Sequence, residues 1–134
     1  MAAEIDFPTL ICQSARTGLF VVDEQERICF WNEWMSRHSA INADTILGQP
    51  VWHLIPESKS RRFTLGVRNC LKLGLSTFMS RALNGAPLPL HPQRRTEDDR
   101  PMHQEIQIIP IMAQGVRHAL VQVDDATSDF SRER

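Results

Sequence analysis

Two short segments carry most of the information about the fold: Gly18-Leu19-Phe20-Val21-Val22-Asp23 and, after three polar residues, Arg27-Ile28-Cys29-Phe30-Trp31. Both runs are rich in aromatic and β-branched side chains, which favour strands. Two such runs joined by a few polar residues predict an antiparallel hairpin. Asn32 follows directly and is a good N-cap, so we expect a helix to begin there with Trp34 and His38 on one side.

Helical patterns lie on both sides of this hairpin. Upstream, we expect a helix from Asp6 to about Thr17, ended by Gly18 in the left-handed conformation. Downstream, residues 44–48 and 51–55 form two short helical turns. A longer amphipathic helix is predicted from about Ser58 to Leu73, with Gly74 as its stop.

The last third of the sequence is typical of strands. We predict strands over residues 76–83, 102–112 and 116–123, the last two joined around Ala113-Gln114-Gly115. The proline-rich and charged residues 85–101 are interpreted as a long exposed loop. Its segment from Ala86 to Pro92 could dock in extended form on an aromatic groove, but stiffening of the loop is the simpler interpretation.

The composition bounds the class of protein. A chain of 134 residues and 15.3 kDa with 42% hydrophobic residues is expected to form one globular domain. A net charge of −1 argues against a basic nucleic-acid-binding module. We find no stretch of membrane-span length and no signal peptide pattern. Cys12, Cys29 and Cys70 have no CxxC spacing, which favours three buried thiols in a cytoplasmic protein, with no metal site.

The order of elements and several motifs resemble the PAS domain, a small sensor module of bacterial signalling proteins. The motifs are residues 18–23, residues 28–32, Ile46-Leu47-Gly48-Gln49-Pro50, and Val121-Gln122-Val123-Asp124-Asp125-Ala126-Thr127. The resemblance implies an α/β fold of the α+β type: a five-stranded antiparallel sheet of order 2-1-5-4-3 with helices on one face and an extra N-terminal helix. It divides the chain into a flanking helix (1–17), the PAS sensor domain (18–127) and the start of a linker (128–134).

The resemblance also implies a function. Asp125-Ala126-Thr127 resembles the signature that begins the linker to an effector in this family, commonly a diguanylate cyclase or a histidine kinase. We therefore expect a non-catalytic sensory or regulatory module, as a homodimer and as a piece of a longer protein. A pure dimerisation module without a ligand stays open. So does a small lyase or isomerase on a curved sheet, although the sequence offers no motif for an acid/base pair.

Cofactors of this family leave different traces in a sequence. The light-sensing branch needs a reactive cysteine where this chain has Val51, so a covalent flavin adduct is excluded and non-covalent flavin binding is not. Haem would need a histidine from the helical half of the domain, for which His53 is a better candidate than His38. Neither cofactor is favoured.

A ligand, if present, is expected between the sheet and the helix 58–73. Its tentative binding residues are Trp34, Trp52, His53, Phe63, Val67 and Asn69. These side chains are mostly apolar and favour a neutral or weakly polar ligand, although the same residues could simply form the core. Gly66 indicates a close approach of this helix to a neighbour or a ligand.

The N-terminal helix carries an apolar face that the sheet does not need for its core. Phe7, Leu10 and Ile11 form this face at helical spacing, and we expect it to be the dimer interface. In the alternative, the helix folds back over its own sheet.

Overall fold

The computed structural model describes residues 5–55, 60–80, 87–91 and 102–126. The helices and strands follow the predicted order. They are α1 (Phe7–Ser14), β1 (Gly18–Val22), β2 (Ile28–Trp31), α2 (Glu33–Ser39), α3 (Ala43–Ile46), α4 (Val51–Leu54), α5 (Arg61–Leu73), β3 (Thr77–Met79), β4 (Gln104–Ala113) and β5 (Val116–Asp125). The α+β class is thus confirmed.

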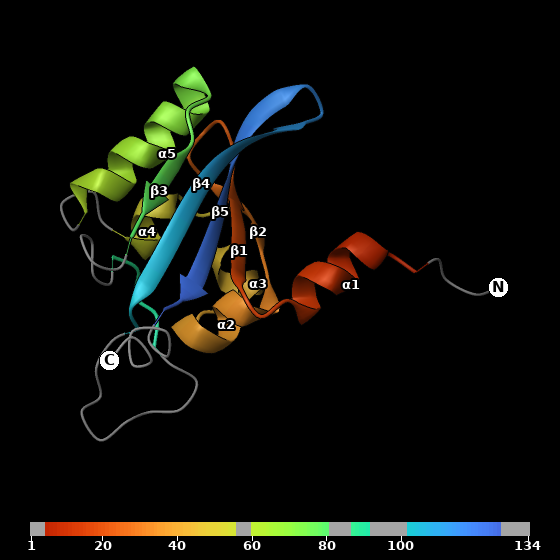
Figure 1. The fold of residues 1–134 in the computed structure, drawn as a ribbon. Helices are drawn as coiled ribbons and strands as arrows, with labels where there is room; N and C mark the ends of the chain where they lie inside the picture. Colours follow the sequence, from red (N-terminus) through yellow and green to blue (C-terminus); the bar gives the residue numbers. More distant parts are fainter. Residues whose placement is uncertain (1–4, 56–59, 81–86, 92–101, 127–134) are drawn as a thin grey trace.

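The strands form one antiparallel sheet in the order β2-β1-β5-β4-β3, as the resemblance implied. β4 and β5 pair along their whole length and make the long ribbon seen in blue in Figure 1. Gln114 and Gly115 join them with φ angles of 53° and 76°. Two positive φ angles in a two-residue loop are those of a type I′ turn, whose twist suits a hairpin.

The core lies between one face of the sheet and the helices that follow β2. In β5, burial alternates: Ala119, Val121 and Val123 are buried and the residues between them are half-buried. Phe63 and Val67 of α5 belong to the same buried cluster, whereas α1 extends away from the sheet (Figure 1). The sheet alternation and the helical spacing therefore place their apolar residues in one shared core.

The ends of two elements differ from the sequence prediction. α5 begins after Ser60, whose hydroxyl accepts the N–H of Phe63 at 3.2 Å, and it ends at Gly74 with a φ of 69°, so the predicted stop is confirmed. The predicted start at Ser58 lies outside the described residues. β3 spans only Thr77–Met79, shorter than the predicted strand, and residues 81–83 are outside the described part.

Gly18 does not end α1, and that prediction was wrong. α1 ends at Ser14, and Gly18 is the first residue of β1 without a left-handed backbone. A Cβ atom at Gly18 would lie 2.6 Å from the sulfur of Met35 and 2.7 Å from the ring of Trp34. Glycine is needed here because α2 packs directly on the backbone of β1.

We predict that Gly18→Ala destabilises the protein by about 1–3 kcal/mol, because the added methyl group overpacks a filled interior. Urea unfolding followed by circular dichroism measures this change. The exposed substitution Thr45→Ala is the control and is expected to change stability by less than about 0.5 kcal/mol. Equal effects of the two substitutions would contradict the packing argument.

The prediction of three buried cysteines was wrong for Cys12 and Cys29. Cys70 is buried, Cys12 is half-buried and Cys29 is exposed, and all three are free thiols. Cys29 lies in β2, where the pairing with β1 is irregular, and its neighbour Ile28 takes the inward position. Burial raises the pKa of Cys70. Partial loss of hydration of the thiol in the sheet raises the pKa of Cys29, and the carboxylate of Asp23 adds to the effect.

Residues 87–91 belong to no helix or strand, as predicted, and Pro89 and His91 are exposed, but the predicted exposure was wrong for two leucines. Leu88 and Leu90 are buried, at 2% and 0% exposure, and belong to the main core. The proline-rich composition predicted a solvated loop. Packing the two leucines in the core removes their apolar surface from water, which stabilises the buried position. The segment from Ala86 to Pro92, for which stiffening of the loop was the preferred interpretation, packs on its own domain over residues 87–91.

Candidate functional site

Asn32 is the centre of a buried junction of four elements. Its side-chain amide donates to the carbonyl oxygens of Cys12 and Thr17, both at 2.9 Å. Its side-chain oxygen accepts from the N–H groups of Leu19, at 3.1 Å, and Met35, at 3.2 Å. The side chain thus caps α2, as predicted, and also fixes the end of α1 against the start of β1.

Thr17 extends this junction to the end of β5. Its hydroxyl donates to the carboxylate of Asp124 at 2.6 Å and lies 3.0 Å from the carbonyl oxygen of Val123. Thr17 comes immediately before β1, and Asp124 is the second-to-last residue of β5. The segments by which the chain enters and leaves the sheet are therefore tied together. Sequence reasoning missed this link, because the two residues are 107 positions apart.

We predict that Asn32→Asp destabilises the protein by about 2–3 kcal/mol. Aspartate keeps the oxygen that caps α2 but cannot donate to the two carbonyl groups of Cys12 and Thr17. The matched control is Asn42→Asp at the start of α3, where the side chain makes no capping hydrogen bond. Chemical unfolding of both variants tests the assignment, and similar losses would argue against it.

Trp34 and His38 lie on the buried side of α2, as predicted. Their rings stack with centroids 4.1 Å apart. His38 Nδ1 is 2.7 Å from the carbonyl oxygen of His91, which requires the proton on Nδ1. The imidazole is therefore held in one orientation between an aromatic ring and a backbone carbonyl.

Trp52 and His53 of α4 lie nearer to solvent. The indole N–H of Trp52 donates to Glu26 at 2.8 Å, and the Arg68 guanidinium pairs with the same carboxylate at 3.0 Å. Arg68 also lies 5.0 Å above the Trp52 ring. These contacts clasp the β1–β2 turn to α4 and α5. His53 is exposed.

The contacts of the Glu26 carboxylate with Arg68 and Trp52, here named the clasp, lower the pKa of Glu26 below its usual value. The hydrogen bond from Arg68 has the larger effect, and that from Trp52 the smaller. A carboxyl with a lowered pKa stabilises the fold above its unfolded-state pKa, and this contribution disappears as pH falls through the folded-state value. No sequence pattern indicated this partner, because Glu26 lies in a polar turn with a φ of 64°.

We predict that the wild-type protein loses more stability than Glu26→Gln when the pH is lowered from 7 to 3. The difference is expected to be below about 1 kcal/mol, because the pair is partly exposed. Urea unfolding at several pH values measures it. Glu24→Gln, in the same turn but exposed, is the control and should follow the wild-type pH dependence. If wild type and Glu26→Gln lost the same stability between pH 7 and pH 3, the stabilising role of the clasp would be refuted.

Phe63 and Val67 are fully buried in α5, and Asn69 is half-buried in its last turns. A Cβ atom on Gly66 would lie 2.8 Å from the Ile108 side chain and 3.3 Å from Thr77. Gly66 therefore allows α5 to approach the sheet closely, and the neighbour at this position is protein. The structure brings Trp34, Phe63 and Val67 into one cluster, with Trp52 packed against it.

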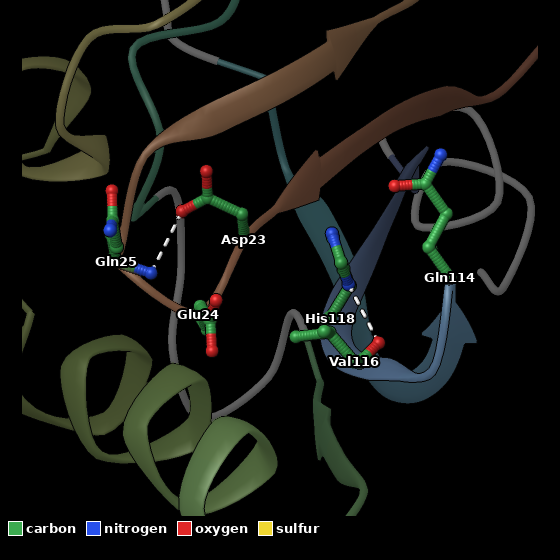
Figure 2. A pocket seen from close by; sticks show the side chains of 7 residues that line it. Asp23, Glu24, Gln25, Gln114, Val116 and His118 are labelled. Atoms are coloured by element: carbon green, nitrogen blue, oxygen red, sulfur yellow. Dashed lines mark hydrogen bonds between the residues drawn. The ribbon is translucent and has the colours of Figure 1, made fainter.

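A separate shallow pocket of about 270 Å³ opens between the β1–β2 turn and the β4–β5 hairpin (Figure 2). It is lined by Asp23, Glu24, Gln25, Ala113, Gln114, Val116 and His118. The Asp23 carboxylate accepts the N–H groups of Gln25, at 2.9 Å, and Arg27, at 3.0 Å. His118 Nδ1 hydrogen-bonds to the Val116 carbonyl oxygen at 2.9 Å. These two side chains thus fix the turns that form the pocket.

The described residues contain neither a candidate metal site nor a candidate membrane-spanning helix. Among residues 5–55, 60–80, 87–91 and 102–126, no group of three or more His, Cys, Asp or Glu side chains could hold a metal ion. Within the same ranges, no helix has the length and apolar character needed to cross a membrane.

Comparison with known proteins gives one family and many structures of the same fold. The sequence matches the family described as PAS fold over residues 7–126. The sensory box sensor histidine kinase from Vibrio cholerae is 22% identical, with 89% of this chain and 87% of that chain covered and a TM-score of 0.62. No curated protein matches the sequence.

Two further similar structures are PAS domains. The domain of nitrogen regulation protein NR(II) from Vibrio parahaemolyticus is 19% identical, covers 90% of this chain and 99% of its own, and has a TM-score of 0.62. The domain from Colwellia psychrerythraea is 17% identical, with 91% and 96% coverage and a TM-score of 0.62. At these identities the likeness shows the shared fold.

Proposed function

Because the chain belongs to the PAS family over residues 7–126, we propose that it is a non-catalytic sensory module that couples a ligand or a partner to an effector joined after residue 127. The observation that carries this proposal is the link between Thr17 and Asp124. It ties the segment that enters the sheet to the segment that leaves it, so a shift of one flank is passed to the other. In this proposal the effector is a histidine kinase or a diguanylate cyclase, and the protein acts in the cytoplasm.

We predict that Thr17→Val in the full-length protein changes the output of the effector at least twofold. Valine keeps the shape of threonine but cannot donate to Asp124. The output is measured as autophosphorylation for a kinase or as cyclic di-GMP synthesis for a cyclase. Thr45→Val on the exposed surface of α3 is the matched control and should leave the output unchanged. An unchanged output in the Thr17→Val protein would refute the proposed coupling.

The ligand part of the proposal uses the interior of the domain. Trp34, Phe63 and Val67 are buried there and would contact the apolar body of a ligand. Trp52, His53 and Asn69 are nearer to solvent and would contact its polar end. An absorbance scan of the purified protein tests haem and flavin, and native mass spectrometry tests colourless ligands. A protein without added mass or colour would favour the pure dimerisation module.

The proposed partner is a second copy of the chain, and α1 forms the interface of this homodimer. No residue of α1 is buried, and Phe7, Leu10 and Ile11 are 54–66% exposed. α1 therefore does not fold back over its own sheet. The outer face of the sheet adds an apolar row, in which Val21 pairs with both Phe30 and Leu120. These three residues of the sheet are half-buried, so the exposed apolar face of α1 is the surface that a second copy would cover.

We predict that Phe7→Asp combined with Leu10→Asp lowers the sedimentation coefficient at micromolar concentration from that of a dimer to that of a monomer. Leu73→Asp introduces a charge at an equally exposed leucine of α5 and is the control. It should leave the dimer intact. A double variant that sediments like the wild-type protein would remove α1 from the interface.

A further inference from the structure

Residues 87–91, here named the strap, form a short segment outside the helices and strands that packs on the core. Leu88 and Leu90 point inward and are buried, whereas Pro89 and His91 are exposed. The N–H of Leu90 donates to the carbonyl oxygen of Leu88 at 2.9 Å, so the chain makes a tight three-residue turn around Pro89. The strap therefore inserts two leucine side chains, two residues apart, into the interior of the domain.

Side chains provide most of the hydrogen bonds that hold the strap. Gln104, only 1% exposed, accepts the N–H of Leu88 at 3.0 Å and donates to the carbonyl oxygen of the same residue at 2.8 Å. His38 Nδ1 binds the carbonyl oxygen of His91, and the N–H of His91 donates to the carbonyl oxygen of His38 at 2.9 Å. Met102 adds one backbone hydrogen bond, from its N–H to the Leu90 carbonyl oxygen, at 3.2 Å.

The strap is not a strand of the sheet. Pro87 and Pro89 have no N–H group, so the segment cannot form a continuous ladder. The five strands pair with one another without it. The strap can consequently leave the core without breaking a hydrogen bond between strands.

We propose that the strap is displaceable and that an apolar peptide-like chain, turned as the strap is, takes its place in the core. This inference rests on the proposed sensory function, since it identifies the occupant of the same interior. The chemistry of the site follows from the strap itself. Two apolar side groups fill the positions of Leu88 and Leu90, and one backbone N–H and one carbonyl group satisfy the buried amide of Gln104.

A neutral occupant fits the site better than a charged one. The groups that bind the strap are the amide of Gln104, the imidazole of His38 and the backbone of Met102. The surrounding core is apolar, so a buried carboxylate or ammonium group would lose its hydration without gaining a partner. The occupant is accordingly an uncharged stretch of apolar peptide.

Peptide binding tests the proposal directly. The probe is the acetylated and amidated peptide Pro-Leu-Pro-Leu-His, which copies the strap and carries a fluorescent label for anisotropy. Leu88→Ser combined with Leu90→Ser weakens the internal competitor, and this variant is expected to bind the probe at least tenfold more tightly than the wild-type protein. Pro89→Ala changes the exposed residue between the two leucines and is the matched control, with wild-type affinity.

A third substitution shows that the probe occupies the site of the strap. Gln104→Leu, added to the double variant, should weaken binding of the probe at least tenfold, because the donor and acceptor are lost. Equal affinity of the double variant and the Pro89→Ala protein would overturn the proposal. Binding that does not depend on Gln104 would also overturn it.

Hydrogen exchange of the wild-type protein gives a second test that needs no variant to fold. The N–H groups of Leu88, Leu90 and His91 are expected to exchange at least tenfold faster than those of Ile108 and Val121 in the centre of the sheet. Exchange of both groups at the same rate would mean that the strap opens only when the whole domain unfolds, and would refute the proposal. Neither test involves an effector, so its failure is distinct from failure of the Thr17→Val experiment.

Discussion

The arrangement of the elements depends on one buried side chain, the amide of Asn32. All four of its hydrogen bonds are made to backbone groups, and these groups belong to α1, β1, α2 and the segment between α1 and β1. A buried polar group that loses a partner costs about 1–3 kcal/mol, so neither α1 nor α2 can shift far without breaking several bonds at once. The backbone of Asn32 adds one more bond, from its N–H to the carbonyl oxygen of Leu19 at 3.0 Å.

Local sequence patterns predicted most of the fold because each pattern reflects a local physical cause. Alternating apolar residues in β1 and β5, the glycine at position 74 and the Gln114-Gly115 turn each act within a few residues of themselves. Asn32 was likewise predictable as the cap of α2. Its bonds to Cys12 and Thr17 were not, because backbone carbonyl groups leave no trace in the sequence.

The strap shows where composition misleads. Three prolines close together, Pro87, Pro89 and Pro92, are typical of a solvated loop, and they outweighed the two leucines between them. The available signal was the pair of leucines on either side of Pro89, which the structure buries together at a tight turn. Gln104, whose amide binds the strap, had no distinguishing pattern. Among the predicted ligand residues, burial of Trp34, Phe63 and Val67 followed from helical spacing, whereas the pairing of Trp52 with Glu26 depends on tertiary contacts.

The short helix α2 connects the two regions on which the proposals rest. Asn32 caps its first turn at the junction of the flanks, and His38 in its last turn binds the strap. Between them, Trp34 packs on the backbone of Gly18 and stacks on His38. Protein interiors are close-packed, so a new occupant in place of Leu88 and Leu90 changes the contacts of the neighbouring side chains.

A displacement of the strap would release His38 from His91 and leave Trp34 as the remaining support of that imidazole. Trp34 itself cannot adjust freely, because Gly18 leaves no space between α2 and β1. In the proposed function an adjustment of α2 reaches its other end, where Asn32 is bonded to Cys12 of α1 and Thr17 is bonded to Asp124. The same few contacts that stabilise the fold thus supply a continuous path from the interior to both flanks of the domain.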